Sequence, residues 1–158
     1  MGILQELLKD IPVPRMMKVR QRFDNEQIED LTAALNEQLN QEKITTLVKP
    51  GMSIAVAVGS RGVDRIVEIT AATIAFLKEL GAEPFIVPSM GSHGGATAEG
   101  QTDVLRHLGV TEESTGAPIR STMEVVKLGE LENGLPVYVD KYASQADGLV
   151  VINRIKPH

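Results

Sequence analysis

The chain of 158 residues contains no cysteine and no tryptophan, and aromatic side chains make up only 3 % of it. The absence of cysteine excludes disulfides, thiolate catalysis and cysteine-ligated metals. The scarcity of aromatic rings argues against a stacking platform for single-stranded nucleic acid. A net charge of −5, from 16 basic and 21 acidic residues, is a poor electrostatic match for a phosphate backbone. The composition therefore predicts a protein that does not bind nucleic acid.

Long apolar runs are also missing. Near the N-terminus the apolar residues are interrupted by Glu6 and followed by Lys9 and Asp10, so no apolar core of a signal peptide forms. No stretch approaches the roughly 18 apolar residues that are needed to span a bilayer. We therefore expect a cytoplasmic protein that does not bind a membrane. Apolar residues account for 42 % of the chain, which at this length predicts one globular domain with its own core.

Apolar runs and helical periodicities alternate along the chain. The runs 53–58, 84–87 and 148–153 are nearly continuous, which is typical of strands buried on both faces. Strict alternation over 16–23 predicts a half-buried strand near a sheet edge, with its basic face in solvent. We expect helices over 64–80, from Thr97 to 108, and from Asp24 or Asn25 to 41, and short strands at 124–126 and 137–139. This order predicts right-handed crossovers and a Rossmann-like three-layer sandwich of the α/β class, with a mainly parallel sheet.

The last residues form a polar turn directly after an apolar strand. Because a natural domain rarely ends there, we expect residues 1–158 to be a single α/β domain from the N-terminal part of a longer, two-domain protein. The missing C-terminal domain is then an expected partner, and a homo-oligomer remains open.

Polar residues follow three of the predicted strands, at 59–62, 91–95 and 153–158. In an open parallel sheet, ligands bind beyond the carboxyl ends of the strands. We therefore predict that Arg61, His93 and His158 lie within reach of one small molecule. An arginine can hold a carboxylate through two parallel hydrogen bonds, and two histidines can serve as general base and general acid.

Each of these residues also has a structural interpretation. Arg61 could cap its loop or pair with Asp64, and the glycines after His93 could serve only the entry to a helix. His93 itself could be a structural hydrogen-bonding residue. His107 lies late in a predicted helix and is expected on the surface.

Three short motifs, Gly59-Ser60-Arg61, Gly91-Ser92-His93 and Lys156-Pro157-His158, carry a resemblance. They resemble the N-terminal domain of nickel-dependent lactate racemase and its relatives, some of which act on other 2-hydroxy acids. The resemblance extends from about Met16 to the last residue. It implies a racemase or epimerase, an isomerase that transfers hydride to and from a nickel pincer nucleotide tethered to a lysine.

The resemblance also implies roles for individual residues. His93 and His158 would exchange the proton of the substrate hydroxyl, and Arg61 would contact the substrate. The cofactor phosphate would be held by small residues of the first two motifs, Gly59, Ser60, Gly91 and Ser92. The tethering lysine and the metal-ligating histidine would lie beyond residue 158, so the resemblance assigns no metal ligand here and implies that the fragment alone is inactive.

The chain departs from the lactate racemase pattern at two positions. Gly94-Gly95 follows His93 in place of Arg-Pro, and Gly62-Val63 follows Arg61 where lactate racemases carry a proline. The particular 2-hydroxy acid is therefore not identified. A non-catalytic phosphate- or nucleotide-binding module that uses the same crevice is the alternative function, and a scaffold for a partner domain is a third.

Overall fold

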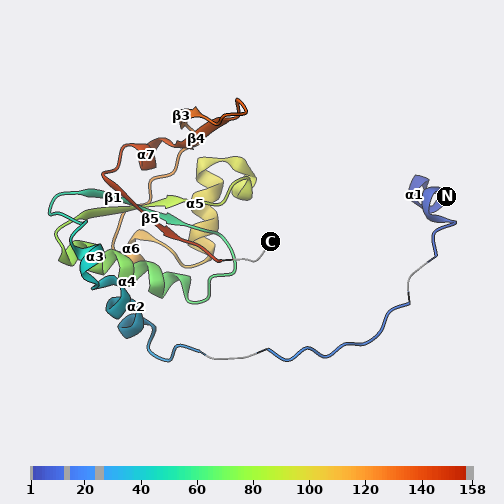
Figure 1. Cartoon of the computed structure of the whole chain (residues 1–158), viewed down its shortest axis with the longest axis horizontal. Coiled ribbons are helices and arrows are strands. Elements are labelled where there is room, and N and C mark those ends of the chain that lie inside the picture. Colours follow the sequence, from blue (N-terminus) through green and yellow to red (C-terminus); the bar gives the residue numbers. More distant parts are fainter. Residues whose placement is uncertain (1, 13–14, 24–26, 156–158) are drawn as a thin grey trace.

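A three-stranded parallel sheet forms the centre of the molecule. The computed structural model describes residues 2–12, 15–23 and 27–155. In the sheet, β1 (Ser53–Val58) lies between β2 (Glu83–Pro88) and β5 (Gly148–Ile152). Val56 is in register with Ile86 on one side and Val150 on the other. The three predicted strands and their parallel arrangement are therefore confirmed (Figure 1).

One face of the sheet carries the main hydrophobic core. Val56 and Ile86 from the sheet pack in one cluster with Ile74 of α4 (Ile66–Glu79) and Leu105 of α5 (Ala98–His107). The side chains of α2 (Leu31–Leu39) and α3 (Glu42–Thr45) add to its margin, and α6 (Glu112–Thr115) packs against α4. Burial of apolar side chains is the main stabilising contribution to folding, and this cluster holds most of the buried ones.

The opposite face of the sheet has a thinner cover. Tyr142 and Ala143, both in the single turn of α7 (Lys141–Ser144), pack on the cluster that contains Ala55 and Phe85. The guanidinium of Arg120 lies 4.3 Å from the centre of the Phe85 ring. Helices thus flank the sheet on both faces, as expected for a Rossmann-like α/β sandwich.

The prediction that β5 is buried on both faces is wrong. Leu149 and Val151, which point to the thinly covered face, are 53 % and 59 % exposed. The reason is that α7 covers β1 and β2, and within the described residues β5 pairs only with β1. Its apolar run is therefore covered on one face only, where Val150 is half-buried and Ile152 is buried in the core.

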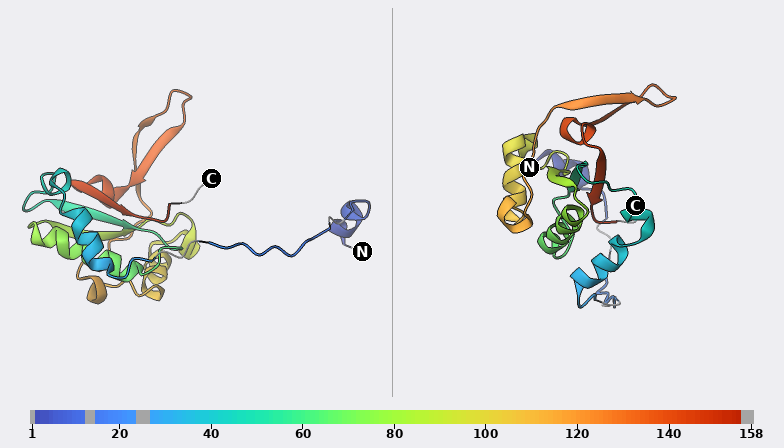
Figure 2. Two further views of the ribbon diagram at one scale, coloured as in Figure 1. Left: turned by 60° about the horizontal axis from the view of Figure 1, so that its bottom comes forward. Right: turned by 90° about the vertical axis from the view of Figure 1, so that its left-hand side faces the viewer.

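A two-stranded hairpin projects from this body (Figure 2). It consists of β3 (Val125–Glu130) and β4 (Pro136–Asp140), and it contains the two short strands predicted from the sequence. Gly134 in its turn has a φ of +81°, a conformation that glycine adopts without steric cost.

The N-terminal part differs most from its predictions. A short helix, α1 (Ile3–Leu8), lies away from the sheet (Figure 1). The segment 16–23 is extended where it is described, but it pairs with no described strand, and Met17 and Val19 are 83 % and 73 % exposed. Alternation alone does not make a strand, because the backbone groups need a neighbour. The start expected for the next helix, Asp24 or Asn25, lies outside the described residues. Residues 27–30 are not helical, and α2 begins at Leu31 because the Asp30 side chain caps it by accepting from the Ala33 amide at 2.9 Å.

None of the helices described in the structure has the length and apolar character that crossing a membrane requires.

The core predicts how the chain responds to truncation of a side chain. Ile74→Ala should lower the free energy of unfolding by about 2–5 kcal/mol, because Ile74 is fully buried between α4 and the sheet and a cavity remains. Leu128→Ala, in the exposed hairpin, is the control and should change it by less than about 0.5 kcal/mol. Urea denaturation followed by circular dichroism measures both values. Equal effects would contradict this description of the core.

Candidate functional site

The carboxyl ends of the three parallel strands meet at one edge of the sheet. Two backbone hydrogen bonds continue the strand pairing past the strand ends. The Gly59 amide donates to the Ile152 carbonyl at 3.2 Å, and the Ser89 amide donates to the Val58 carbonyl at 2.9 Å. The loops that follow the strands therefore leave the sheet side by side, at the edge where open parallel sheets bind ligands.

Two of the predicted site residues are in direct contact at this edge. Ser60, in the loop after β1, places its Oγ 2.5 Å from Nδ1 of His93, in the loop after β2. Both side chains are half-buried. A hydroxyl both donates and accepts, so Ser60 can bond to either neutral tautomer of the imidazole. The contact occupies Nδ1 and leaves Nε2 as the ring nitrogen available to a ligand.

Glycine geometry determines how the His93 loop enters α5. Gly94 and Gly95 have φ values of +63° and +67° within the single turn His93–Ala96, labelled η1. The backbone of Gly94 packs directly on that of Gly100, so that a Cβ on Gly94 would overlap the Gly100 carbonyl. Thr97 begins α5, as predicted, because its Oγ1 accepts from the Gly100 amide at 3.0 Å. The glycines therefore bring the histidine loop onto the first turn of the helix.

A buried side chain that sequence reasoning missed holds the start of the same loop. Gln101 of α5 is 6 % exposed, and its Nε2 donates to the Gly91 carbonyl at 2.7 Å. Gly91 itself and Ser92 are exposed. The only sequence signal for Gln101 was a polar side chain one turn into a helix that follows a glycine-rich loop.

The loop after β1 also contacts the end of β5. Asn153 Oδ1 lies 3.3 Å from the position that a Cβ on Gly59 would occupy, and the Arg154 side chain lies against Gly62. Sequence reasoning placed neither Asn153 nor Arg154 in the site. Arg61 is exposed and forms no ion pair with any described residue, so the predicted alternative of pairing with Asp64 is not observed in this part of the chain.

Of the other two histidines, the structure describes His107 but not His158. His107 is exposed at the end of α5, where its Nδ1 lies 2.7 Å from the Asp103 carbonyl oxygen, in agreement with the surface position expected for it. His158, with Lys156 and Pro157, lies outside the described residues, so the proximity of two histidines remains a prediction. Within the described ranges no three His, Cys, Asp or Glu side chains gather to hold a metal ion.

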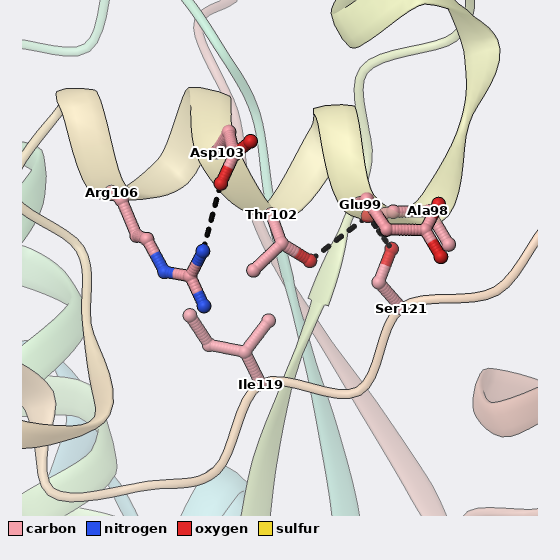
Figure 3. Close-up of a pocket in the computed structure, with 7 residues that line it drawn as sticks. All are labelled: Ala98, Glu99, Thr102, Asp103, Arg106, Ile119 and Ser121. Carbon is pink, nitrogen blue, oxygen red and sulfur yellow. Dashed lines mark hydrogen bonds and ion pairs between the residues drawn. The ribbon is translucent and has the colours of Figure 1, made fainter.

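A separate hollow of about 430 Å³ lies between α5 and residues 119–121 (Figure 3). Its lining contains none of the predicted site residues. Its arginine, Arg106, is paired with Asp103 at 2.8 Å, and Thr102 and Ser121 both donate to the Ala98 carbonyl. Figure 3 marks these contacts by dashed lines, and all of them join groups of the hollow to one another.

The sheet order and the helices on both faces define a Rossmann-like α/β domain, with polar residues in the loops at the carboxyl edge of its sheet. The chain belongs to the family described as the lactate racemase N-terminal domain, whose family model matches residues 7–158. The resemblance deduced from the three motifs is therefore confirmed. Comparison with curated proteins and with solved structures finds no significant match.

The close approach of Gly94 to α5 leads to a stability prediction. Gly95→Ala should cost about 1 kcal/mol, because alanine is strained at a φ of +67° although the space around it is open. Gly94→Ala combines the same strain with an overlap onto the Gly100 backbone, so it should cost at least twice as much. Urea denaturation measures the difference. Two equal losses would show that the loop does not pack on α5 as described.

Proposed function

We propose that this chain is the N-terminal part of a racemase or epimerase that acts on a 2-hydroxy acid. The activity belongs to a longer protein whose second domain covers the carboxyl edge of the sheet. Two observations support the proposal: the family match over residues 7–158, and the contact of Ser60 with His93 at the strand ends. The second carries more weight for the chemistry, because it orients an imidazole where a parallel sheet binds its ligands.

His93 is the proposed proton-transfer residue. The hydroxyl group at C2 of the substrate lies at Nε2, since Ser60 occupies Nδ1 at 2.5 Å. When Nε2 takes the hydroxyl proton, Nδ1–H donates to Ser60 Oγ. This hydrogen bond stabilises the imidazolium cation and fixes the orientation of its ring. When Nε2 returns the proton, the same contact holds the neutral ring. His158 is the proposed second proton-transfer residue on the opposite side of C2.

Arg61 is the proposed anchor for the substrate carboxylate. Its guanidinium is exposed at the same edge and is adjacent in sequence to Ser60, and within the described ranges it has no carboxylate partner. A guanidinium matches a carboxylate with two parallel hydrogen bonds. Such a contact would fix the rotation of the acid about its first carbon–carbon bond and so set the position of C2 against His93.

The family resemblance implies a nickel pincer nucleotide as cofactor, and the described residues fit its phosphate. The Ser60 hydroxyl and the small, exposed Gly91 and Ser92 can donate to phosphate oxygens. Gly59 is buried and its amide already donates to the Ile152 carbonyl, so it would contribute only the turn that presents Ser60. When bound, the group would supply a hydride acceptor for the hydrogen at C2 of the substrate. Ligands for the metal are not assigned to the described residues, where no three-donor group is found.

The longer protein, produced together with the enzymes that make the cofactor, tests this proposal. Intact-mass measurement should reveal a lysine-linked nucleotide adduct, and chiral chromatography should detect interconversion of the two forms of a 2-hydroxy acid. Without a mass increase and without interconversion of any acid tested, the proposal is wrong. Binding of inorganic phosphate that needs Ser92 but not His93 would then support the phosphate-binding module.

Replacement of the proposed proton-transfer residue should abolish most of the activity. His93→Ala should lower kcat by about 10²- to 10⁴-fold, because a positioned general base or acid contributes that much. His107→Ala is the matched control, since His107 is exposed on α5 and bonds only to its own helix in the structure; its kcat should stay within about twofold of wild type. A similar loss in both variants would remove His93 from the mechanism.

A further inference from the structure

We infer that Arg154 is a second anion-binding residue of this site, so that the 2-hydroxy acid carries an additional carboxylate at its far end. The inference rests on the proposed function and names the substrate class within it. It comes from three features of the described residues: where the Arg154 side chain lies, the order of side chains along the carboxyl edge, and the lack of a carboxylate partner for either arginine.

The Arg154 side chain lies in space that a glycine leaves open. Its Cδ and Nη1 are 2.7 Å and 2.8 Å from the position that a Cβ on Gly62 would occupy. Any other residue at Gly62 would displace the arginine, and the φ of +74° there already favours glycine. The Arg154 amide donates to Asn153 Oδ1 at 2.8 Å, which shapes the turn after β5. The guanidinium is thus seated on the loop that carries Arg61.

The strand order places the site residues in a row. His93 contacts the loop 59–62 from the β2 side through Ser60, and Arg154 contacts it from the β5 side at Gly62. Neighbouring strands are about 4.8 Å apart, so β2 and β5 are about 10 Å apart on either side of β1. An acid held at Arg61 with its C2 toward His93 would therefore extend along this edge toward Arg154. A short dicarboxylate with a 2-hydroxyl group fits this row.

Among the residues that the structure describes, no carboxylate balances the positive charges at this edge. Neither Arg61 nor Arg154 forms an ion pair with a described residue, whereas Arg65 pairs with Glu68 and Arg106 with Asp103. Arg154 lies against Gly62, the neighbour of Arg61 in the chain, so an anion bound at this loop can offset the positive charge of both side chains. A monocarboxylate such as lactate satisfies one of them, and a dicarboxylate such as malate satisfies both.

The experiment compares malate with lactate in the longer, cofactor-loaded protein. Wild type should have a kcat/KM for malate at least about tenfold above that for lactate, because one charge-assisted contact is worth that much. Arg154→Ala should raise KM for malate about ten- to hundredfold with little change in kcat, and should leave lactate unaffected. Arg154→Lys should recover part of the malate affinity. Arg106→Ala, at an arginine that is paired on α5, is the control.

A second pair of variants tests the contact between the Arg154 side chain and Gly62. Gly62→Ala should reproduce the malate defect, because its Cβ takes the place of the Arg154 side chain. Gly134→Ala is the matched control, since Gly134 has a similar φ of +81° but open space around it. It imposes comparable backbone strain at the hairpin tip and should leave KM unchanged. Circular dichroism establishes that all variants are folded.

The outcomes separate this inference from the function on which it rests. If lactate and malate are isomerised alike and Arg154→Ala changes both or neither, the inference is wrong and the proposed function stands. If neither acid nor any other 2-hydroxy acid is isomerised, the proposed function fails. Calorimetric titration of the cofactor-free protein with malate then still tests whether Arg154 binds a carboxylate of malate. Arg154→Ala should weaken that binding and Arg106→Ala should not.

Discussion

The parallel pairing of β1 with β2 on one side and β5 on the other is the interaction on which the rest of the structure depends. It buries the apolar run of β1 in the core cluster with α4 and α5. It also brings three strand ends to one edge, where the amides of Gly59 and Ser89 extend the hydrogen bonding by one residue past β1 and β2. Ser60, Arg61, His93 and Arg154 all lie in the segments that follow these strand ends.

Close backbone contacts then decide where the side chains of the site lie. Gly94 packs on Gly100 and so positions the His93 loop against α5, while Gly62 leaves space in which Arg154 is seated. Both are positions where a Cβ would overlap a neighbour. The candidate site is consequently a row of polar groups in loops of small residues, in which Ser60 and His93 are half-buried and Arg61 is exposed.

Sequence reasoning predicted the site at the level of strand ends but not of individual contacts. It identified the loops of Ser60 and His93 from apolar runs that end in glycine-rich polar turns. It missed Gln101, because a glutamine within a helix has no local feature that reveals a buried contact with the Gly91 carbonyl. It also treated Arg154 only as part of the polar segment 153–158, since its contact with Gly62 spans more than ninety residues of sequence. The strand expected at 16–23 failed for the same reason: alternation describes a face but supplies no neighbour.

The sequence by itself determined the class of fold, the three core strands, the start of α5 at Thr97 and the family. These depend on local periodicity, on helix caps and on short motifs, each of which involves only residues that are close together in the sequence. Tertiary structure decided the contact between Ser60 and His93, the position of the Arg154 side chain against Gly62, and the exposure of one face of β5. These depend on the order of the strands and on which helices cover them, and no stretch of neighbouring residues encodes that order.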